Sequence, residues 1–411
     1  MEEDQEINYS LIKSGMKSWE WASSRMNVVK TILDEFAAKK PLKDIRIGLC
    51  LHITKETAVL ALALKRLGGT IAICSANPLS VQDNIAAFLT SIGVKVFARR
   101  GATMKEYYKY IQEVLATHPQ ILVDDGSDMH VMAHSSGRRA IKGGTEETTS
   151  GIRRLKALEV SHKLKYPIVG VDYAKTKRLF DNRYGTGQST LDAIIRITDL
   201  LIAGKNIVVC GYGPVGKGVS ERARGLGARV TVTETNALRA LQAHMDGFDV
   251  KQLFDVSGDG DIFITCTGQT EVIRKEHIRK MKSGSILANA GHFDTEIDIK
   301  YLDLNCENRY LVRPYLECFQ IQRKKIYLLS SGRVVNLIGS EGNAPEVMSM
   351  SFANQLLSII YISKNHGKLR KRLYAVPVEI DDHVAMAALK CFSVKIDKLT
   401  DRQLNYNTSY N

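Results

Sequence analysis

The stretch from Val208 to Gly218 reads VVCGYGPVGKG and decides the fold of the central part of the chain. Gly211 permits a tight turn after an apolar run, Gly213 lets the backbone approach a pyrophosphate, and Gly216 allows a helix to pack closely on the preceding strand. Glu234 follows 18 residues after Gly216, at the end of the next predicted strand. A carboxylate at that point can hold ribose hydroxyls, so the pattern predicts a Rossmann domain that binds a dinucleotide.

The same residues favour one dinucleotide. The charge of Glu234 would repel a 2′-phosphate, which favours NAD over NADP. Arg239 lies nearby in the sequence and keeps NADP open as an alternative, because an arginine can pair with that phosphate.

Apolar patterns on both sides of the motif predict a parallel sheet covered by helices. Before the motif we expect strands at Ile45–Leu51, Thr70–Cys74, Lys95–Ala98 and Ile121–Val123, and helices at Glu56–Leu67 and Gln82–Ile92. Around and after it we expect a helix capped by Ser189 and closed by Gly204, strands at Ile207–Cys210, Arg229–Thr233, Ile262–Thr265 and Ser285–Asn289, and a helix from Pro345 to Gly367.

The length of 411 residues predicts two domains, because a single core rarely grows so large. The fold class expected is α/β, with a Rossmann NAD-binding domain at 184–345 inserted in a discontinuous α/β substrate-binding domain. Residues 1–183 and 346–372 would form that outer domain, and 373–411 a small C-terminal oligomerisation segment. The crossings near Asn182–Tyr184 and Gly342–Pro345 would act as hinges.

Composition excludes several classes of protein. Seven cysteines, none in a Cys-x-x-Cys pair, argue against a disulfide framework and a zinc site, and we predict no metal. The net charge of +13 is spread along the chain without a nucleic-acid-binding motif, so no nucleic-acid partner is expected. No apolar run is long enough for a membrane span, and the start lacks a basic signal-peptide region. A cytoplasmic protein is therefore expected.

Several motifs, in order along almost the whole chain, resemble the S-adenosylhomocysteine hydrolase family. The ending, with Val376–Asp382 followed by Lys398–Thr400, resembles the shorter type found in archaea and some thermophilic bacteria. The matching segments are Cys50–Leu60, Asp124–Asp128, Glu146–Gly151, Thr176–Gly185, Val208–Gly218 and Asn289–Asp298.

The resemblance implies a reaction in which bound NAD is catalytic and is not consumed. The ribose 3′-hydroxyl is oxidised to a ketone, the 4′-hydrogen becomes acidic, the homocysteine thiol is eliminated, water adds at C5′, and the hydride returns. It also implies a nucleoside substrate and a homotetramer. Residues implied to contact NAD are Gly211, Gly213, Val215, Gly216, Glu234, Arg239, Thr267, Asn289 and Asn336.

Six catalytic residues are implied by the same resemblance. Lys177 and Asp181 would act at the 3′-hydroxyl, and Asp125 would be the base near C4′. Glu147 would hold the ribose hydroxyls. His52 and His292 would handle the protons of water and of the leaving group, a task that suits a pKa near neutrality. Outside this context, a Lys-x-x-x-Asp pair would indicate an ordinary helix ion pair.

Four further residues are implied to bind the substrate. Asn182 would lie between sugar and nicotinamide, and Thr54 and Glu56 would meet the purine. The family carries a strand corresponding to Val334–Ile338, followed by a histidine that contacts the adenine edge. Asn343 stands in place of that histidine, and an asparagine can still donate to and accept from a purine.

Two alternatives to hydrolysis of S-adenosylhomocysteine stay open, and Asn343 supports the first of them. One keeps the ribose chemistry and changes the base, as in S-inosylhomocysteine. The other is a catalytically silent relative that binds NAD and nucleoside.

Overall fold

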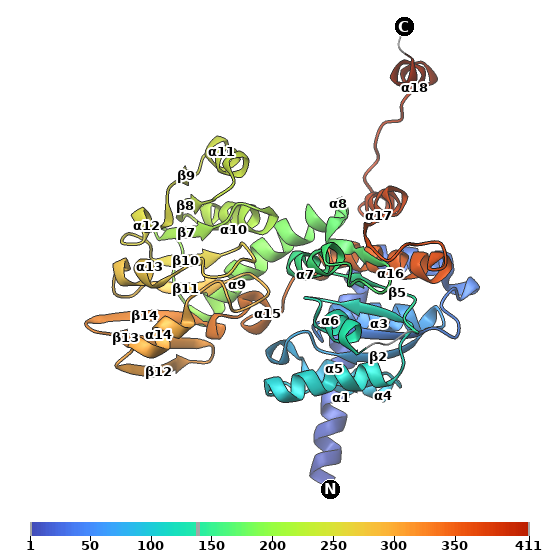
Figure 1. The fold of residues 1–411 in the computed structure, drawn as a ribbon, viewed down its shortest axis with the longest axis horizontal. Coiled ribbons are helices and arrows are strands. Elements are labelled where there is room, and N and C mark those ends of the chain that lie inside the picture. The colour runs from blue at the N-terminus through green and yellow to red at the C-terminus, as the bar shows by residue number, and fades with distance from the viewer. Residues whose placement is uncertain (1, 137–139, 410–411) are drawn as a thin grey trace.

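The computed structural model describes residues 2–136 and 140–409, and each of its two lobes is built on one β-sheet (Figure 1). The first sheet has seven strands, all parallel, in the order β15-β6-β5-β4-β1-β2-β3. Its strands are β1 (Arg46–Cys50), β2 (Thr70–Cys74), β3 (Lys95–Phe97), β4 (Ile121–Asp124), β5 (Gly143–Glu146), β6 (Ile168–Gly170) and β15 (Leu373–Ala375).

The second sheet has eight strands in the order β12-β13-β14-β11-β10-β7-β8-β9. Strands β14, β11, β10, β7, β8 and β9 pair in parallel in the Rossmann order, and β12 and β13 add an antiparallel edge. Its strands are β7 (Asn206–Cys210), β8 (Arg229–Thr233), β9 (Asp249–Val250), β10 (Ile262–Thr265), β11 (Ile286–Asn289), β12 (Asn308–Arg313), β13 (Leu316–Ile321) and β14 (Lys324–Leu329).

Helices cover both sheets, and α9 leads from one lobe to the other (Figure 1). In the first lobe and its return they are α1 (Glu2–Arg25), α2 (Asn27–Phe36), α3 (Lys55–Arg66), α4 (Asp83–Ser91), α5 (Met104–Ala116), α6 (Asp128–Ser135), α7 (Thr149–Val160), α8 (Lys175–Arg178), α16 (Pro345–Asn365), α17 (Val378–Cys391) and α18 (Asp401–Thr408). In the second lobe they are α9 (Thr186–Thr198), α10 (Pro214–Gly225), α11 (Ala237–Met245), α12 (Leu253–Val256), α13 (Lys275–Lys280), α14 (Ile299–Asn305) and α15 (Val335–Ile338).

The order of the strands in each sheet indicates where a ligand would bind. In the first sheet, β2 and β3 lie on one side of β1 and β4 on its other side, so the strand order reverses between β1 and β4. In the second sheet, the order reverses in the same way between β7 and β10. Ligands of open parallel sheets bind beyond the carboxyl ends of the strands at such switch points. His52 and Asp125 follow β1 and β4, whereas Gly211 and Thr267 follow β7 and β10. The α/β class with a Rossmann-type sheet is thus confirmed.

Three sequence expectations differ from the structure. The helix expected to begin at Ser189 begins at Thr186, because the π-helical turn Asp181–Gly185 continues into it, and it ends at Thr198, before Gly204. The strand expected at Val334–Ile338 is helix α15; a short apolar run fits either structure. The β12–β14 edge was not predicted.

The C-terminal part also differs in part from the expected segment 373–411. Strand β15 pairs with β6, and α17 packs against α2 and α16, so residues 373–391 belong with the first sheet. The chain then extends away from the body and ends in α18 (Figure 1). No helix among the described residues is long and apolar enough to cross a membrane.

Candidate active site

A cleft with a volume of about 270 Å³ lies between the lobes, where the two switch points face each other. All ten predicted catalytic and substrate-binding residues line it, together with five of the nine predicted cofactor contacts. The lining residues that the sequence predicted are His52, Thr54, Glu56, Asp125, Glu147, Lys177, Asp181, Asn182, His292, Asn343, Gly213, Val215, Arg239, Thr267 and Asn336.

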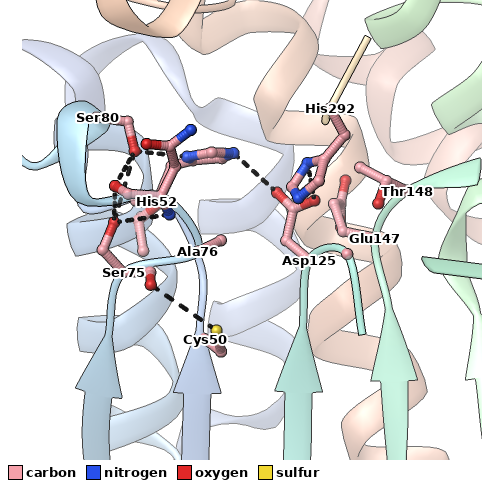
Figure 2. A network of polar contacts seen from close by, with 12 residues as sticks. Cys50, His52, Ser75, Ala76, Ser80, Asp125, Glu147, Thr148 and His292 are labelled. Carbon is pink, nitrogen blue, oxygen red and sulfur yellow. Dashed lines mark hydrogen bonds and ion pairs between the residues drawn. The ribbon is translucent and has the colours of Figure 1, made fainter. Parts of the chain in front are cut away.

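Asp125 lies between two imidazoles at the end of β4 (Figure 2). Its carboxylate is 3.5 Å from Nε2 of His52 and 3.5 Å from Nδ1 of His292. Burial lowers the pKa of His52 to about 4, so this imidazole is neutral near pH 7, and its Nδ1 lies 2.6 Å from the Ser80 hydroxyl. A carboxylate with a neutral imidazole at hand can accept a proton and pass it on. The donor atoms of these three residues lie within 4.8 Å of one another and could also hold a metal ion.

Lys177 is buried in the cleft, and its ammonium group lies among polar side chains. Its Nζ is 3.2 Å from Asp181 and 3.7 Å from Asp172, and it donates to Oδ1 of Asn182 at 2.5 Å. Burial lowers the pKa of Lys177, but the charges of Asp181, Glu147 and Asp172 outweigh burial and hold the pKa above its ordinary value. The side chain is therefore a charged ammonium, suited to stabilising negative charge on a nearby oxygen.

Glu147 is a second buried carboxyl close to Lys177. Burial raises the pKa of Glu147 to about 8, against the opposing charge of Lys177, whose Nζ is 3.9 Å away. Glu147 therefore carries a proton near neutrality. Gln355 donates to its Oε2 at 2.6 Å, while the buried Oε1 has no hydrogen-bond partner among the described residues. Such an acceptor fits a sugar hydroxyl.

The glycine loop fits a dinucleotide. A Cβ at Gly216 would lie 1.9 Å from the carbonyl oxygen of Gly211, so the turn requires glycine there, whereas a Cβ at Gly213 would meet nothing closer than Arg239 at 3.8 Å. Glu234 accepts hydrogen bonds from the amides of Tyr212, Thr235 and Asn236. Burial raises the pKa of Glu234, but these amides outweigh burial and lower it, so the acid is charged. The residues therefore suit NAD.

Comparison with known proteins agrees with this geometry. Residues 5–140 match the family described as S-adenosyl-L-homocysteine hydrolase, and residues 182–342 match its NAD binding domain. The chain belongs to the S-adenosyl-L-homocysteine hydrolase family. The second match supports NAD as the cofactor of this family member.

Three curated relatives of the family cover almost the whole chain. An adenosylhomocysteinase from Sulfurisphaera tokodaii is 51% identical over 97% of this chain and 96% of its own length. One from Aquifex aeolicus is 46% identical over 98% and 97%. An S-inosyl-L-homocysteine hydrolase from Methanocaldococcus jannaschii is 50% identical over 99% and 98%.

Four predicted cofactor residues do not line the cleft: Gly211, Gly216, Glu234 and Asn289. The two glycines shape the turn behind it. Asn289 is fully buried, and its amide bonds to Thr265, Gly291, Phe293 and Gly332. In this family member Asn289 therefore supports the loop that carries His292.

Buried carboxyls that the sequence analysis did not single out hold the site in place. Glu146 accepts from the amide of Gly126, the hydroxyl of Ser127 and the amide of Thr148, and so ties the loop after Asp125 to the loop after Glu147. Burial raises the pKa of Glu146 well above its ordinary value. Its place beside Glu147 in the sequence was the available signal.

Asp172 and Glu296 are two more such residues. Asp172 is fully buried and accepts from Asn182 at 2.9 Å, Arg178 at 3.0 Å and Thr149 at 2.7 Å. Glu296 accepts from the backbone of Thr267 and Gly268, which shapes the loop after β10. The supporting role of these two residues could not be predicted from a sequence motif, because most of their hydrogen-bond partners lie 10 to 29 residues away in the chain.

Contacts also join the lobes across the cleft. Arg153 on α7 donates to the carbonyl oxygens of Gly268 at 2.6 Å and Thr267 at 3.1 Å. Lys55 on α3 lies 2.9 Å from Glu341 and 3.3 Å from Glu56. The contacts of Arg153 with Thr267 and Gly268 and of Lys55 with Glu341 hold the two lobes together beside the cleft.

Proposed function

We propose that this chain hydrolyses S-adenosyl-L-homocysteine to adenosine and L-homocysteine, and catalyses the reverse reaction. The net reaction breaks the C5′–S bond, forms a C5′–O bond with water and moves one proton to sulfur. The observation that carries the proposal is the Lys177 ammonium held beside Asp181 in the cleft that the glycine loop also lines.

NAD, when bound, supplies a hydride acceptor for C3′ and later returns the hydride. Lys177 and Asp181 hold the 3′-hydroxyl, and the charged ammonium stabilises the oxygen as its proton leaves toward the carboxylate. The protonated Glu147 holds the neighbouring hydroxyl through its unpartnered Oε1. Asn182, fixed by Asp172, keeps the ammonium in place.

Asp125 accepts the proton of C4′ once the ribose carries a ketone at C3′. His52 and His292 lie on either side of this carboxylate and can deliver a proton to the departing sulfur or remove one from the incoming water. Closure of the lobes, held by Arg153, keeps bulk water from the ketone.

Glu56 supports a purine as the base. Its side chain is buried, and Oε1 lies 3.3 Å from the Lys55 ammonium but has no hydrogen bond among the described residues. A carboxylate oxygen can accept from the amino group of adenine or from the N–H of hypoxanthine. Thr54 caps α3 beside it.

The second candidate substrate is S-inosylhomocysteine, because Glu56 can accept from either purine and a relative named S-inosyl-L-homocysteine hydrolase is 50% identical to this chain. The test is turnover of both thioethers by the purified, NAD-loaded protein. Equal or greater turnover of the inosyl compound would replace the first proposal by the second. The silent-relative alternative requires that adenosine bind without any change in the nicotinamide absorbance band.

We also propose the domain division and setting predicted from the sequence: a substrate-binding unit of 1–183 and 346–372, which β15 and α17 extend to 391, a cofactor unit of 184–345, a cytoplasmic location and a homotetramer. Exposed apolar side chains along the C-terminal extension, among them Ile396, Leu399 and Leu404, support subunit contacts there. Light scattering on the purified protein tests the subunit number.

A further inference from the structure

Asn343 lies at the second crossing between the lobes, and its side-chain amide is fully engaged by protein. Nδ2 donates to Oδ1 of Asp181 at 2.5 Å and to the Thr186 hydroxyl at 3.0 Å. Oδ1 accepts from the Ser189 hydroxyl at 2.7 Å and from Nδ2 of Asn336 at 3.2 Å. An asparagine amide offers two donor hydrogens and an oxygen with two lone pairs, so its whole capacity is used.

The orientation of this amide follows from its partners. A carboxylate accepts hydrogen bonds and cannot donate them, so the atom facing Asp181 must be the nitrogen. The oxygen then faces Ser189 and Asn336, both of which can donate. To read a purine edge, Asn343 would have to break one of these four bonds.

Asn343 donates the hydrogen bond to one of the two carboxylate oxygens of Asp181. Oδ2 accepts a hydrogen bond from the Ser351 hydroxyl at 2.8 Å and lies 3.2 Å from the Lys177 ammonium. Oδ1 accepts a hydrogen bond from Asn343. The contact also joins the two crossings, since Asp181 begins the π-helical turn of the first crossing. Gly185 makes room for it: a Cβ there would lie 3.1 Å from Cγ of Asn343.

Asn336 extends this set of contacts toward the cofactor side of the cleft. Its Nδ2 donates to Ser189 and Asn343, and its buried Oδ1 has no hydrogen-bond partner among the described residues. Asn336, Asn343, Asp181 and Lys177 thus form a continuous hydrogen-bonded and ionic series from the predicted cofactor contact to the catalytic ammonium.

We propose that Asn343 is a positioning residue that sets the Asp181 carboxylate against Lys177 and does not select the purine base. The inference rests on the proposed function, because it assigns Asp181 to the ribose 3′-hydroxyl. Selection between 6-amino and 6-oxo purines then falls to other residues, with Glu56 the nearest candidate.

The test compares wild type, Asn343→Ala and Asn343→Asp as NAD-loaded enzymes with S-adenosyl- and S-inosylhomocysteine. Loss of a hydrogen bond to a charged group should lower kcat by about 10- to 100-fold for both substrates. KM should stay within about threefold of wild type, and so should the ratio of the two kcat/KM values. A threefold change corresponds to less free energy than one hydrogen bond to a charged group contributes. Asn343→Asp keeps the shape, places a carboxylate against Asp181, and should lose more. Asn305→Ala, an exposed amide on α14, is the control.

A change of tenfold or more in the ratio, with kcat retained, would overturn the inference, because it would mean that Asn343 reads the base. If Asn343→Ala did not fold, the isosteric Asn343→Asp would carry the comparison. If wild type turned over neither thioether, the proposed function would be wrong. The ratio of adenosine to inosine affinity in wild type and variant, measured by calorimetry, would still decide whether Asn343 selects the base.

Discussion

The ammonium of Lys177 lies 3.2 Å from the carboxylate of Asp181, one helical turn further along the chain, and both side chains are buried. On an exposed helix such a pair contributes little to stability. Here Asp172 lies 3.7 Å from the same ammonium, and the Glu147 carboxyl, whose pKa burial raises to about 8, lies 3.9 Å from it. The cation therefore balances buried acids, in addition to the role at the 3′-hydroxyl proposed above.

Lys177→Met should lower kcat by at least about 100-fold, because the 3′-oxygen loses its charged partner. It should also lower the free energy of unfolding by about 3–5 kcal/mol, since buried carboxylates lose their counter-charge. Lys175→Met, an exposed lysine on the same short helix, is the control. Steady-state kinetics and urea unfolding measure both effects, and wild-type turnover in Lys177→Met would contradict the assigned role.

His52 should make stability depend on pH in the acid range. Its pKa is lowered from 6.5 to about 4 by burial, so the unfolded chain binds the proton more readily than the folded one. Stability is therefore present above pH 6.5 and is lost as the pH falls toward 4, by up to about 3 kcal/mol.

The difference in unfolding free energy between wild type and His52→Asn, measured from pH 7 to pH 4, isolates this residue. Buried His130, whose pKa burial lowers to about 3, contributes equally to both proteins. A difference that stays constant with pH would show that His52 does not titrate as expected.

Glu234 should control the choice of dinucleotide. Glu234→Gln removes the charge that disfavours a 2′-phosphate. We therefore expect NAD affinity to fall by about tenfold and the ratio of NADP affinity to NAD affinity to rise. Equilibrium dialysis with each dinucleotide measures the ratio. Asp249→Asn removes one exposed negative charge from the neighbouring strand β9 and should leave the ratio unchanged.

Arg153 should stabilise the closed arrangement of the lobes. Arg153→Ala removes its two bonds to the backbone at Thr267 and Gly268. We expect KM for the thioether to rise by about 3- to 10-fold, together with a larger radius of gyration in small-angle scattering of the NAD-bound protein. Lys156→Ala, exposed on the same helix, should change neither.

Much of the cleft could be predicted because its residues sit in short local motifs. Strands β2, β8 and β10 begin and end where the apolar runs do. The glycine spacing around Gly213 determines a turn whose geometry is local. Residues that follow strand ends, such as His52 and Asp125, meet because parallel strands share one edge.

The parts that escaped prediction depend on contacts between remote segments. Asp172 has no motif, and its importance comes from Asn182 and Thr149 packing onto it. Strand β15 joins the first sheet only because the chain returns through α16 after the second lobe is complete.

The sequence by itself determined the α/β class, the dinucleotide loop and the set of chemically able side chains, because each depends on spacing along a few tens of residues. Tertiary structure alone decided how those side chains are used. Asn343 faces Asp181, 162 residues earlier in the chain, and Glu147 carries a proton because burial and the distance to Lys177 set its pKa. Hydrogen-bond direction and desolvation are properties of the assembled interior, which no single segment contains.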